Sequence, residues 1–255
     1  MSTLAASQSS TSASNKGLVI VTGASSGIGA AVAKRFSAAG HPLLLLARRV
    51  DRMEALGLPN ALCEQVDVTN PEELKRAVEK AELRFGPASL LVNNAGVMLL
   101  GSTVDQDAAE WAKMINVNVF GVLNGVKAVL AGMLKRRKGT IVNVTSIADR
   151  KLFPNHAVYC ATKYAVKAFT EGVRMEASAS GVRCIVVAPG VVETELLSHT
   201  TSAEIKSDYN GWKEGELQGQ PLRPEDIADC VFFANSMPAH VTVRELVVGP
   251  TFQKD

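Results

Sequence analysis

The sequence is poor in several features that mark particular classes of protein. The four cysteines, Cys63, Cys160, Cys184 and Cys230, lie far apart, so no spacing suits a metal site or a redox pair. The formal net charge of +2 is too small to indicate a nucleic-acid partner. No uninterrupted apolar run approaches the roughly 20 residues of a membrane-spanning helix. We therefore predict a cytoplasmic protein with buried thiols and without a metal, nucleic-acid or membrane partner.

The first residues of the chain differ in composition from the remainder. Residues 1–15 are rich in Ser, Thr and Ala and contain no Arg or Lys. A secretory signal needs a basic start and a continuous apolar stretch, and a mitochondrial presequence needs arginines, so neither is expected. We predict a disordered tail over 1–16 and a single domain over 17–255, because no linker-like stretch interrupts the chain after residue 16.

From residue 17 onward, short apolar runs alternate with segments of helical periodicity. Strands are predicted at 18–21, 43–46, 62–66, 90–92, 140–144, 182–187 and 241–248, and helices at 30–39, 70–85, 108–135, 157–179 and from 224. Continuous apolar strands separated by helices are typical of a parallel sheet covered on both faces. We predict an α/β fold with a doubly wound, Rossmann-type, seven-stranded parallel sheet, whose ligands bind beyond the carboxyl ends of the strands.

A glycine-rich loop joins the first predicted strand to the first predicted helix. It reads Thr22-Gly23-Ala24-Ser25-Ser26-Gly27-Ile28-Gly29. Gly23 permits a tight turn, while Gly27 and Gly29 let the backbone approach a pyrophosphate and let the helix pack on the strand. The helix N-terminus supplies unpaired N–H groups for the phosphates. The spacing differs from G-x-G-x-x-G, and no Lys follows as in a P-loop, but its position between strand and helix favours dinucleotide binding.

The spacing of Thr22 and the three glycines resembles that of the short-chain dehydrogenase/reductase family in its single-domain form. Further family landmarks follow in order: Asp67-Val68, Asn93-Asn94-Ala95-Gly96, Asn118, Ser146, Tyr159-Cys160-Ala161-Thr162-Lys163, and Pro189-Gly190 with Val192 and Thr194. Residues 241–253 are similar to the NADP-dependent 3-hydroxy acid and clavulanate dehydrogenase group. The resemblance implies an NADP(H)-dependent oxidoreductase that transfers a hydride between the nicotinamide and a small carbonyl or secondary-alcohol substrate. It also implies a homo-oligomer, which we expect to be a tetramer.

The expected chemistry rests on four polar residues. Tyr159 and Lys163 are four residues apart on a predicted helix, so their side chains share one face. A free tyrosine has a pKa near ~10, and a nearby ammonium is expected to lower it, so that Tyr159 acts as general acid and base. Ser146 would hydrogen-bond the substrate oxygen. By resemblance, Lys163 also binds the nicotinamide ribose, and Asn118 holds a water that links Lys163 to solvent.

The resemblance places further residues around the cofactor. Asp67 is expected to accept a hydrogen bond from the adenine amino group, although an aspartate there also suits a helix cap. Thr194 would bind the carboxamide. The full predicted cofactor set is Gly23, Ser25, Ser26, Gly27, Ile28, Gly29, Arg48, Arg49, Asp67, Val68, Asn94, Ala95, Gly96, Tyr159, Lys163, Pro189, Gly190, Val192 and Thr194.

The end of the second predicted strand indicates which dinucleotide is preferred. NAD-specific sheets usually place an Asp or Glu there to bind the ribose 2′-hydroxyl, and such a carboxylate would repel a 2′-phosphate. This sequence has Ala47 followed by Arg48 and Arg49. Arginine binds phosphate oxygens through two parallel N–H groups, and the Ser25 hydroxyl adds a donor. We predict NADP(H), with Arg48 as the main determinant. The alternative is that both arginines lie in a solvated turn.

The substrate is the least determined part of the interpretation. Segments after the fourth, fifth and sixth strands offer Val97, Met98, Leu152, Phe153, His156, Val191, Leu196 and Leu197, with a mobile region up to Trp212. Arg150, Lys151, His156 and His199 suit a carboxylate, or else are surface charges. A 3-oxoacyl-thioester reductase, a steroid- or retinoid-type reductase and a non-catalytic dinucleotide sensor stay open. Cys160, beside Tyr159, is interpreted as a small packing residue.

Overall fold

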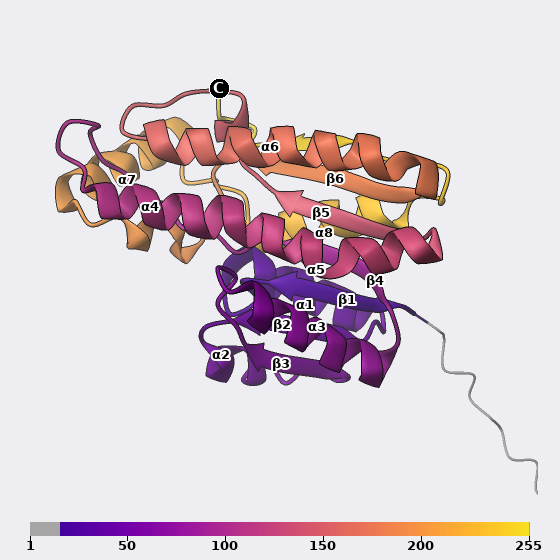
Figure 1. Ribbon diagram of the computed structural model, residues 1–255. Coiled ribbons are helices and arrows are strands. Elements are labelled where there is room, and N and C mark those ends of the chain that lie inside the picture. Colours follow the sequence, from indigo (N-terminus) through magenta and orange to yellow (C-terminus); the bar gives the residue numbers. More distant parts are fainter. Residues whose placement is uncertain (1–15, 255) are drawn as a thin grey trace, which may run out of the picture.

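The computed structural model describes residues 16–254, and its centre is a seven-stranded sheet in which every neighbouring pair is parallel (Figure 1). The strand order is β3-β2-β1-β4-β5-β6-β7. The strands are β1 (Leu18–Thr22), β2 (Leu43–Ala47), β3 (Ala61–Gln65), β4 (Ala88–Asn93), β5 (Gly139–Val144), β6 (Val182–Pro189) and β7 (Glu245–Val248). The order reverses between β1 and β4, so a ligand is expected at their carboxyl ends. The predicted Rossmann-type fold is confirmed.

Helices cover both faces of the sheet (Figure 1). They are α1 (Gly27–Ala38), α2 (Val50–Glu54), α3 (Pro71–Phe85), α4 (Ala108–Ile115), α5 (Gly121–Arg136), α6 (Ala157–Ala177), α7 (Ala203–Leu217) and α8 (Pro224–Ser236). The start of α3 shows why the sequence folds this way locally. The Asn70 side chain accepts hydrogen bonds from the backbone N–H groups of Glu72 and Glu73, and Pro71 occupies the first turn.

The apolar strands build two cores, one on each face of the sheet. Leu18 and Ile20 of β1 pack with α3, α5 and α6, whereas Val19 and Val21 pack with α1 and α8. Successive side chains of a strand point to opposite faces, so only a continuous apolar run supplies both cores. This explains why the strands are uninterrupted apolar runs rather than alternating ones.

Several elements differ from the prediction. The strand predicted at 241–248 begins only at Glu245, because residues 241–244 form a loop before the edge of the sheet. The short helix α2 was not predicted, and the region predicted to be mobile contains α7. The tail predicted at 1–16 lies outside the described residues except for Lys16.

The helix predicted at 108–135 is present, but it contains one irregular turn. α4 and α5 are joined without a break by a π-helical segment, Asn116–Phe120. By length and composition the run Ala108–Arg136 is apolar enough to cross a membrane, which corrects the expectation that no segment is long enough. This is weak evidence, since core helices of soluble proteins meet the same criterion, and this run packs against α3, α6 and the strands β4 and β5.

Candidate functional site

A cleft of about 890 Å³ lies at the carboxyl ends of the strands. It is lined by every predicted cofactor and catalytic residue except Gly29 and Asn118. The segments that supply these residues follow β1, β2, β3, β4, β5 and β6, so residues far apart in the sequence meet at one edge of the sheet. The cleft therefore lies where ligands bind in open parallel sheets.

The glycine loop and the segment after β4 are held together. The Asn94 side chain donates to the carbonyls of Thr22 (3.1 Å) and Gly23 (3.3 Å), and the Thr22 hydroxyl accepts from the N–H groups of Asn94 and Ala95. Gly23 has φ of +66°, and a Cβ there would lie 2.8 Å from the Ala95 Cα. A Cβ on Gly29 would lie 2.3 Å from the Gly23 carbonyl oxygen. Gly29 thus serves the close packing of helix on loop.

The N-terminus of α1 is open toward the cleft. Its cap residue, Ser26, makes no side-chain capping bond, and its first turn contains no acidic residue. The first N–H groups of the helix therefore donate no hydrogen bond to the Ser26 side chain. They point at the cleft, as an anion site requires. A Cβ added to Gly27 would lie 3.1 Å from the Thr194 methyl group, so the segment after β6 covers this loop.

The two arginines after β2 have different surroundings. Arg49 donates to the hydroxyls of Ser25 (3.3 Å) and Ser26 (3.0 Å) and to the Glu195 carboxylate (3.0 Å). Arg52 pairs with the same carboxylate at 2.8 Å. Arg48 is exposed and has no hydrogen bond or ion pair within residues 16–254. Glu195 was not predicted, because its partners lie more than 140 positions away in the sequence.

Asp67 closes its own loop rather than capping a helix. Its carboxylate accepts from the N–H (2.9 Å) and the hydroxyl (2.8 Å) of Thr69, while its N–H donates to Glu73. The cap of α3 is Asn70. The capping alternative for Asp67 is therefore wrong, and Asp67 lines the cleft as predicted.

Ser146, Tyr159 and Lys163 lie together at the inner end of the cleft. Ser146 lies just after the end of β5. Tyr159 and Lys163 lie on one face of α6, and these two residues are only 5% and 7% exposed. The Lys163 ammonium donates to the Val144 carbonyl at 3.2 Å and lies 5.6 Å from the centre of the Tyr159 ring. The Ser146 side chain lies close enough to the Tyr159 phenol to act on its pKa, and its hydroxyl accepts from the Ala148 N–H at 3.2 Å. This arrangement places a proton donor, a second hydroxyl and a buried cation around one point.

Burial changes the pKa values of both helix residues. Desolvation raises the pKa of Tyr159, and the neighbouring Ser146 side chain opposes this rise. Desolvation also lowers the pKa of Lys163 to about 8. The expectation that Lys163 lowers the pKa of the phenol is therefore not met here, since burial has the larger effect. At neutral pH Tyr159 is protonated and Lys163 is charged.

Asn118 lies beneath the cleft within the π-helical segment. Its amide nitrogen donates to the Val97 carbonyl (2.9 Å) and the Thr162 hydroxyl (3.1 Å), and its amide oxygen accepts from the Val97 N–H (2.8 Å). It thus fixes the chain after β4 against α6, next to Lys163. π-helical turns occur often at functional sites, but apolar periodicity does not reveal them. The water expected at Asn118 stays a prediction.

The outer part of the cleft is apolar and aromatic. His156 lies 5.6 Å from Phe153, 6.3 Å from Tyr159 and 6.1 Å from Tyr209, and Tyr209 lies 5.6 Å from Trp212, all between ring centres. His156 Nδ1 contacts the Pro154 carbonyl at 2.6 Å, and burial lowers the pKa of the imidazole. Burial raises the pKa of Tyr209 to about 12. These groups are uncharged at neutral pH.

The predicted substrate residues line the cleft, with one exception. Val97, Met98, Lys151, Leu152, Phe153, His156, Val191, Leu196, Leu197, His199 and Trp212 are in the lining, together with Leu100, Ala148, Ile205, Tyr209 and Gln253, which were not predicted. Arg150 is not in it, since Asp149 and Glu245 hold its guanidinium elsewhere. The helical spacing of Ile205, Tyr209 and Trp212 is the signal that would have revealed α7.

Two further expectations concern cysteine and metal. Cys160 is fully buried, its thiol donates to the Lys151 carbonyl at 3.6 Å, and burial raises the pKa of the thiol. These properties agree with a packing residue. Within residues 16–254, no group of three His, Cys, Asp or Glu side chains is arranged to hold a metal ion.

A family model described as short chain dehydrogenase matches residues 17–205, which is most of the chain. The chain belongs to the short-chain dehydrogenase family. A curated oxidoreductase of Staphylococcus saprophyticus is 39% identical to it over 242 residues, which cover 92% of this chain and 96% of the relative. The family and its oxidoreductase class, expected from the order of the motifs, are therefore confirmed. The finer grouping with 3-hydroxy acid and clavulanate dehydrogenases is not.

Two solved dehydrogenase structures have a similar fold. The closed form of a serine dehydrogenase complexed with NADP+ has a TM-score of 0.86 and 30% identity, covering 93% of this chain and 96% of that one. An alcohol dehydrogenase from the archaeon Thermococcus sibiricus, complexed with 5-hydroxy-NADP, has a TM-score of 0.81 and 27% identity, covering 94% and 99%.

Proposed function

We propose that this short-chain dehydrogenase transfers a hydride between NADP(H) and a carbonyl or secondary-alcohol substrate, with Tyr159 as general acid and base. The observation that carries the proposal is the meeting of Ser146, Tyr159 and Lys163 in the cleft that the glycine loop also lines. NADP in two neighbours of similar fold supports the choice of cofactor. The nicotinamide, when bound, supplies or accepts the hydride.

The protein residues handle the proton and the developing charge. In reduction, Tyr159 donates its phenolic proton to the carbonyl oxygen of the substrate, and it takes the proton back from the alcohol in the reverse direction. Ser146 donates a hydrogen bond to the same oxygen. The Lys163 ammonium, held by the Val144 carbonyl, stabilises the phenolate that the transfer leaves. The deep burial of Tyr159 and Lys163 strengthens these charge interactions.

A non-catalytic dinucleotide sensor is the alternative of a different class. A sensor needs the glycine loop but has no need of a buried Tyr159–Lys163 pair beside Ser146. The test is to follow NADPH consumption by the purified protein with a panel of ketones and aldehydes. Substrate-dependent consumption supports the enzyme. Tight NADPH binding without consumption on any member of the panel supports the sensor.

The lining near Tyr159 favours a substrate without a charge. His156 is neutral, Arg150 is held outside the cleft, and Lys213 pairs with Glu193 at 3.2 Å. Lys151 lies at the exposed rim. The Lys163 ammonium is held by the Val144 carbonyl and is expected to bind the nicotinamide ribose. A carboxylate close to the reacting carbon would thus be desolvated among apolar and aromatic side chains, which is unfavourable. We propose uncharged carbonyl compounds with an apolar or aromatic substituent, rather than 3-hydroxy acids.

A matched pair of substrates tests this proposal. We expect kcat/KM for the ethyl ester of a 3-oxo acid to exceed that for the free acid by at least about tenfold, equivalent to about 1.4 kcal/mol. Replacing Tyr209 with Ala removes part of the aromatic lining and should lower kcat/KM for an aryl ketone more than for acetone. A preference of the wild-type protein for the free acid would contradict the proposal and restore the hydroxy acid interpretation.

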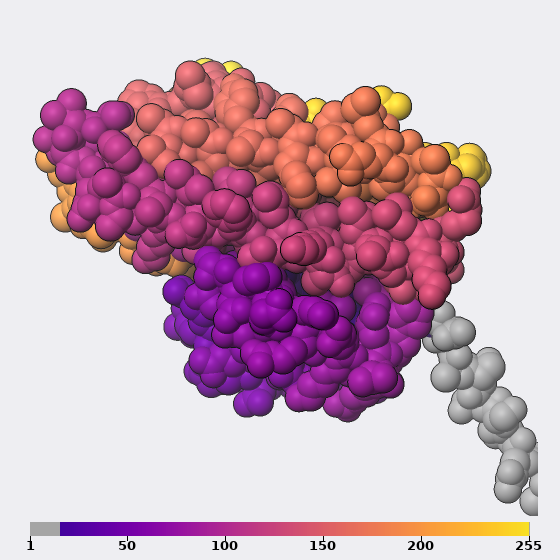
Figure 2. Space-filling model, in the orientation of Figure 1, coloured from indigo at the N-terminus to yellow at the C-terminus, as the bar shows by residue number. Residues whose placement is uncertain are grey.

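We also propose that the protein is a homo-oligomer, most simply a tetramer. The helices α4, α5 and α6 form one continuous part of the surface, coloured magenta to orange in Figure 2. Large apolar side chains are exposed on this part of the chain, namely Ile115, Phe120, Tyr164 and Met175. A second copy that covered them would remove this apolar area from water.

Light scattering at micromolar concentration checks the oligomeric state. We expect a mass about four times the chain mass of 27.0 kDa. Met175→Glu should lower this mass, because it introduces a charge on the proposed interface, whereas Leu83→Glu, an exposed apolar residue on α3, should leave it unchanged. A monomeric mass for the wild-type protein would refute the prediction.

A further inference from the structure

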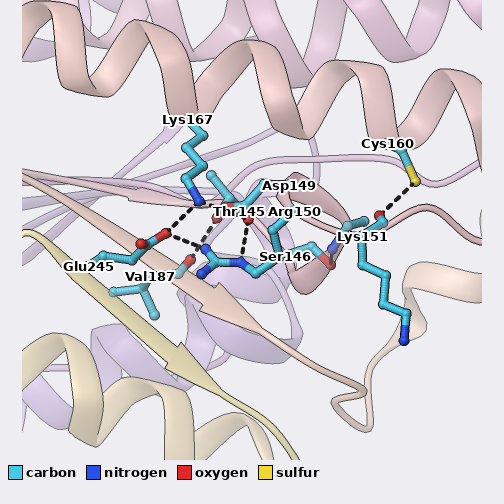
Figure 3. A network of polar contacts seen from close by, with 10 residues as sticks. Thr145, Ser146, Asp149, Arg150, Lys151, Cys160, Lys167, Val187 and Glu245 are labelled. Carbon is cyan, nitrogen blue, oxygen red and sulfur yellow. Dashed lines mark hydrogen bonds and ion pairs between the residues drawn. The ribbon is translucent and has the colours of Figure 1, made fainter. Parts of the chain in front are cut away.

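The turn after β5 that carries Ser146 also carries a buried carboxylate, that of Asp149 (Figure 3). The Asp149 side chain is 0% exposed. Its carboxylate accepts from the Thr145 hydroxyl at 2.6 Å and from Arg150 Nε at 2.8 Å, and Lys167 Nζ lies 3.8 Å away. A buried charge persists only where partners of this kind surround it.

A second carboxylate completes the cluster. Glu245, at the start of β7, pairs with Arg150 and, at 3.0 Å, with Lys167 (Figure 3). The cluster thus contains two carboxylates and two cations, so its formal charge is zero. It connects the edge strand β7, the helix α6 and the turn after β5, three elements that are distant in the sequence.

Asp149 contacts the same turn that carries Ser146. The Asp149 N–H donates to the Ser146 carbonyl at 2.9 Å, closing the short turn Ile147–Asp149. Thr145, the residue before Ser146, is held on one side by Asp149 and on the other by the Val187 carbonyl, which accepts its N–H at 2.8 Å. The backbone of Ser146 is therefore fixed through contacts at both ends of its turn, and its hydroxyl accepts from the Ala148 N–H at 3.2 Å.

The cluster also meets the catalytic face of α6. Tyr159, Lys163 and Lys167 follow one another at intervals of four residues, so they form one stripe along this helix. Lys167, the third member, contacts Asp149, while the first two belong to the site. The carboxylate of Asp149 thus lies at the third member of the stripe and does not line the cleft.

We propose that Asp149 is a positioning residue for the reaction: its carboxylate holds the Ser146 turn against α6 and supplies the negative charge that keeps Lys163 an ammonium in a buried place. The proposal rests on the function proposed above, because it assigns Asp149 to the same catalytic groups. Asp149 touches neither the cleft nor the reacting atoms, so it acts through Ser146, Lys163 and Tyr159.

The electrostatic part agrees with the pKa shifts of the two catalytic groups. The Asp149 carboxylate raises the pKa of Lys163 against the larger lowering by burial, and it also raises the pKa of Tyr159. The other ionisable groups around them are Arg150, Cys160, Lys167, Tyr209 and Glu245. Of these, Tyr209 and Cys160 also raise the pKa of Tyr159.

The sign of the expected pH effect follows from these contacts. Carbonyl reduction needs Tyr159 protonated and Lys163 charged, so kcat/KM should fall as the pH rises through the pKa of Lys163, about 8. Asp149→Asn keeps the shape of the side chain and removes its charge. The pKa values of Lys163 and Tyr159 should then both fall, moving the alkaline limb of the profile to lower pH by roughly half a unit to one unit.

The experiment compares pH profiles of kcat/KM for the wild type, Asp149→Asn and Glu245→Gln. Glu245 belongs to the same cluster but does not contact the Ser146 turn, so Glu245→Gln should move the limb less than half as far. KM at neutral pH should change little in Asp149→Asn, since the residue does not touch substrate, whereas kcat falls. A pH profile of Asp149→Asn that coincides with that of the wild type would overturn the proposal, because a purely structural role predicts no shift of the alkaline limb.

Lys167→Gln provides an independent test if Asp149→Asn does not fold. Lys167 is only partly buried, and removing its charge leaves Asp149 less neutralised. The alkaline limb should therefore move in the opposite direction, to higher pH. A shift to lower pH, or none, contradicts the proposal. If the wild-type protein reduces no carbonyl compound, the proposed function itself has failed. If the wild-type protein is active and these variants do not move its alkaline limb, only the role of Asp149 has failed.

Discussion

Replacing Tyr159 with Phe should give a protein that folds and binds NADPH but turns over about 10²–10⁴-fold more slowly. The Tyr159 ring is almost fully buried in a cluster with Val97, Met98 and Ala148, and the Phe ring would still fill this space. The phenolic proton is lost, and with it the buried acid that lies beside Ser146. The effect should therefore appear in kcat while the affinity for NADPH is retained.

Steady-state kinetics and NADPH fluorescence titration measure the two parts of this prediction. Tyr164→Phe is the matched control, because Tyr164 lies on the same helix and is exposed away from the cleft. It should leave turnover near the wild-type value. Activity of Tyr159→Phe close to the wild type would exclude Tyr159 as the proton donor.

The wild-type protein should prefer NADPH to NADH, and Arg48→Ala should reduce this preference by roughly tenfold to 150-fold. A charge-assisted hydrogen bond contributes ~1.5–3 kcal/mol, which corresponds to this range. Arg48 follows Ala47 at the end of β2, lines the cleft and is exposed without an ion pair within the part of the chain described here. Its guanidinium can approach a 2′-phosphate without losing another partner.

Arg49→Ala serves as the comparison for Arg48→Ala. Arg49 already donates to Ser25, Ser26 and Glu195, so a phosphate at this position would compete with the Glu195 carboxylate. We expect a smaller change in the ratio of kcat/KM for the two cofactors. The assignment to Arg48 fails if the wild type prefers NADH or if Arg48→Ala leaves the ratio unchanged.

The central strands could be predicted because their sequences satisfy a strong local requirement. Residues 18–21 and 43–46 are buried on both faces, so they must be apolar without interruption. The edge strand β7 is half exposed and alternates, which made its start uncertain. α7 contains Gly211 and Gly215 and has few buried residues, so its helical signal was weak.

The candidate site could be predicted where its residues form local motifs. The glycine loop and the Tyr159–Lys163 spacing each lie within a few positions of sequence. The pairing of Glu195 with Arg49 and of Glu245 with Arg150 joins segments that only the folded chain brings together. The balance between burial and charge at Tyr159 also depends on packing, and for this reason the direction of its pKa shift was predicted wrongly.

Transfer of deuterium from NADPH tests the central claim most directly. NADPH carrying deuterium at the transferable position of the nicotinamide is incubated with the wild-type protein and an uncharged aryl ketone, and the product is analysed by mass spectrometry and NMR. The account predicts a secondary alcohol with deuterium on the carbinol carbon, and almost none with Tyr159→Phe. If the wild-type protein binds NADPH yet no member of a ketone and aldehyde panel gains deuterium, the protein is not the oxidoreductase proposed here.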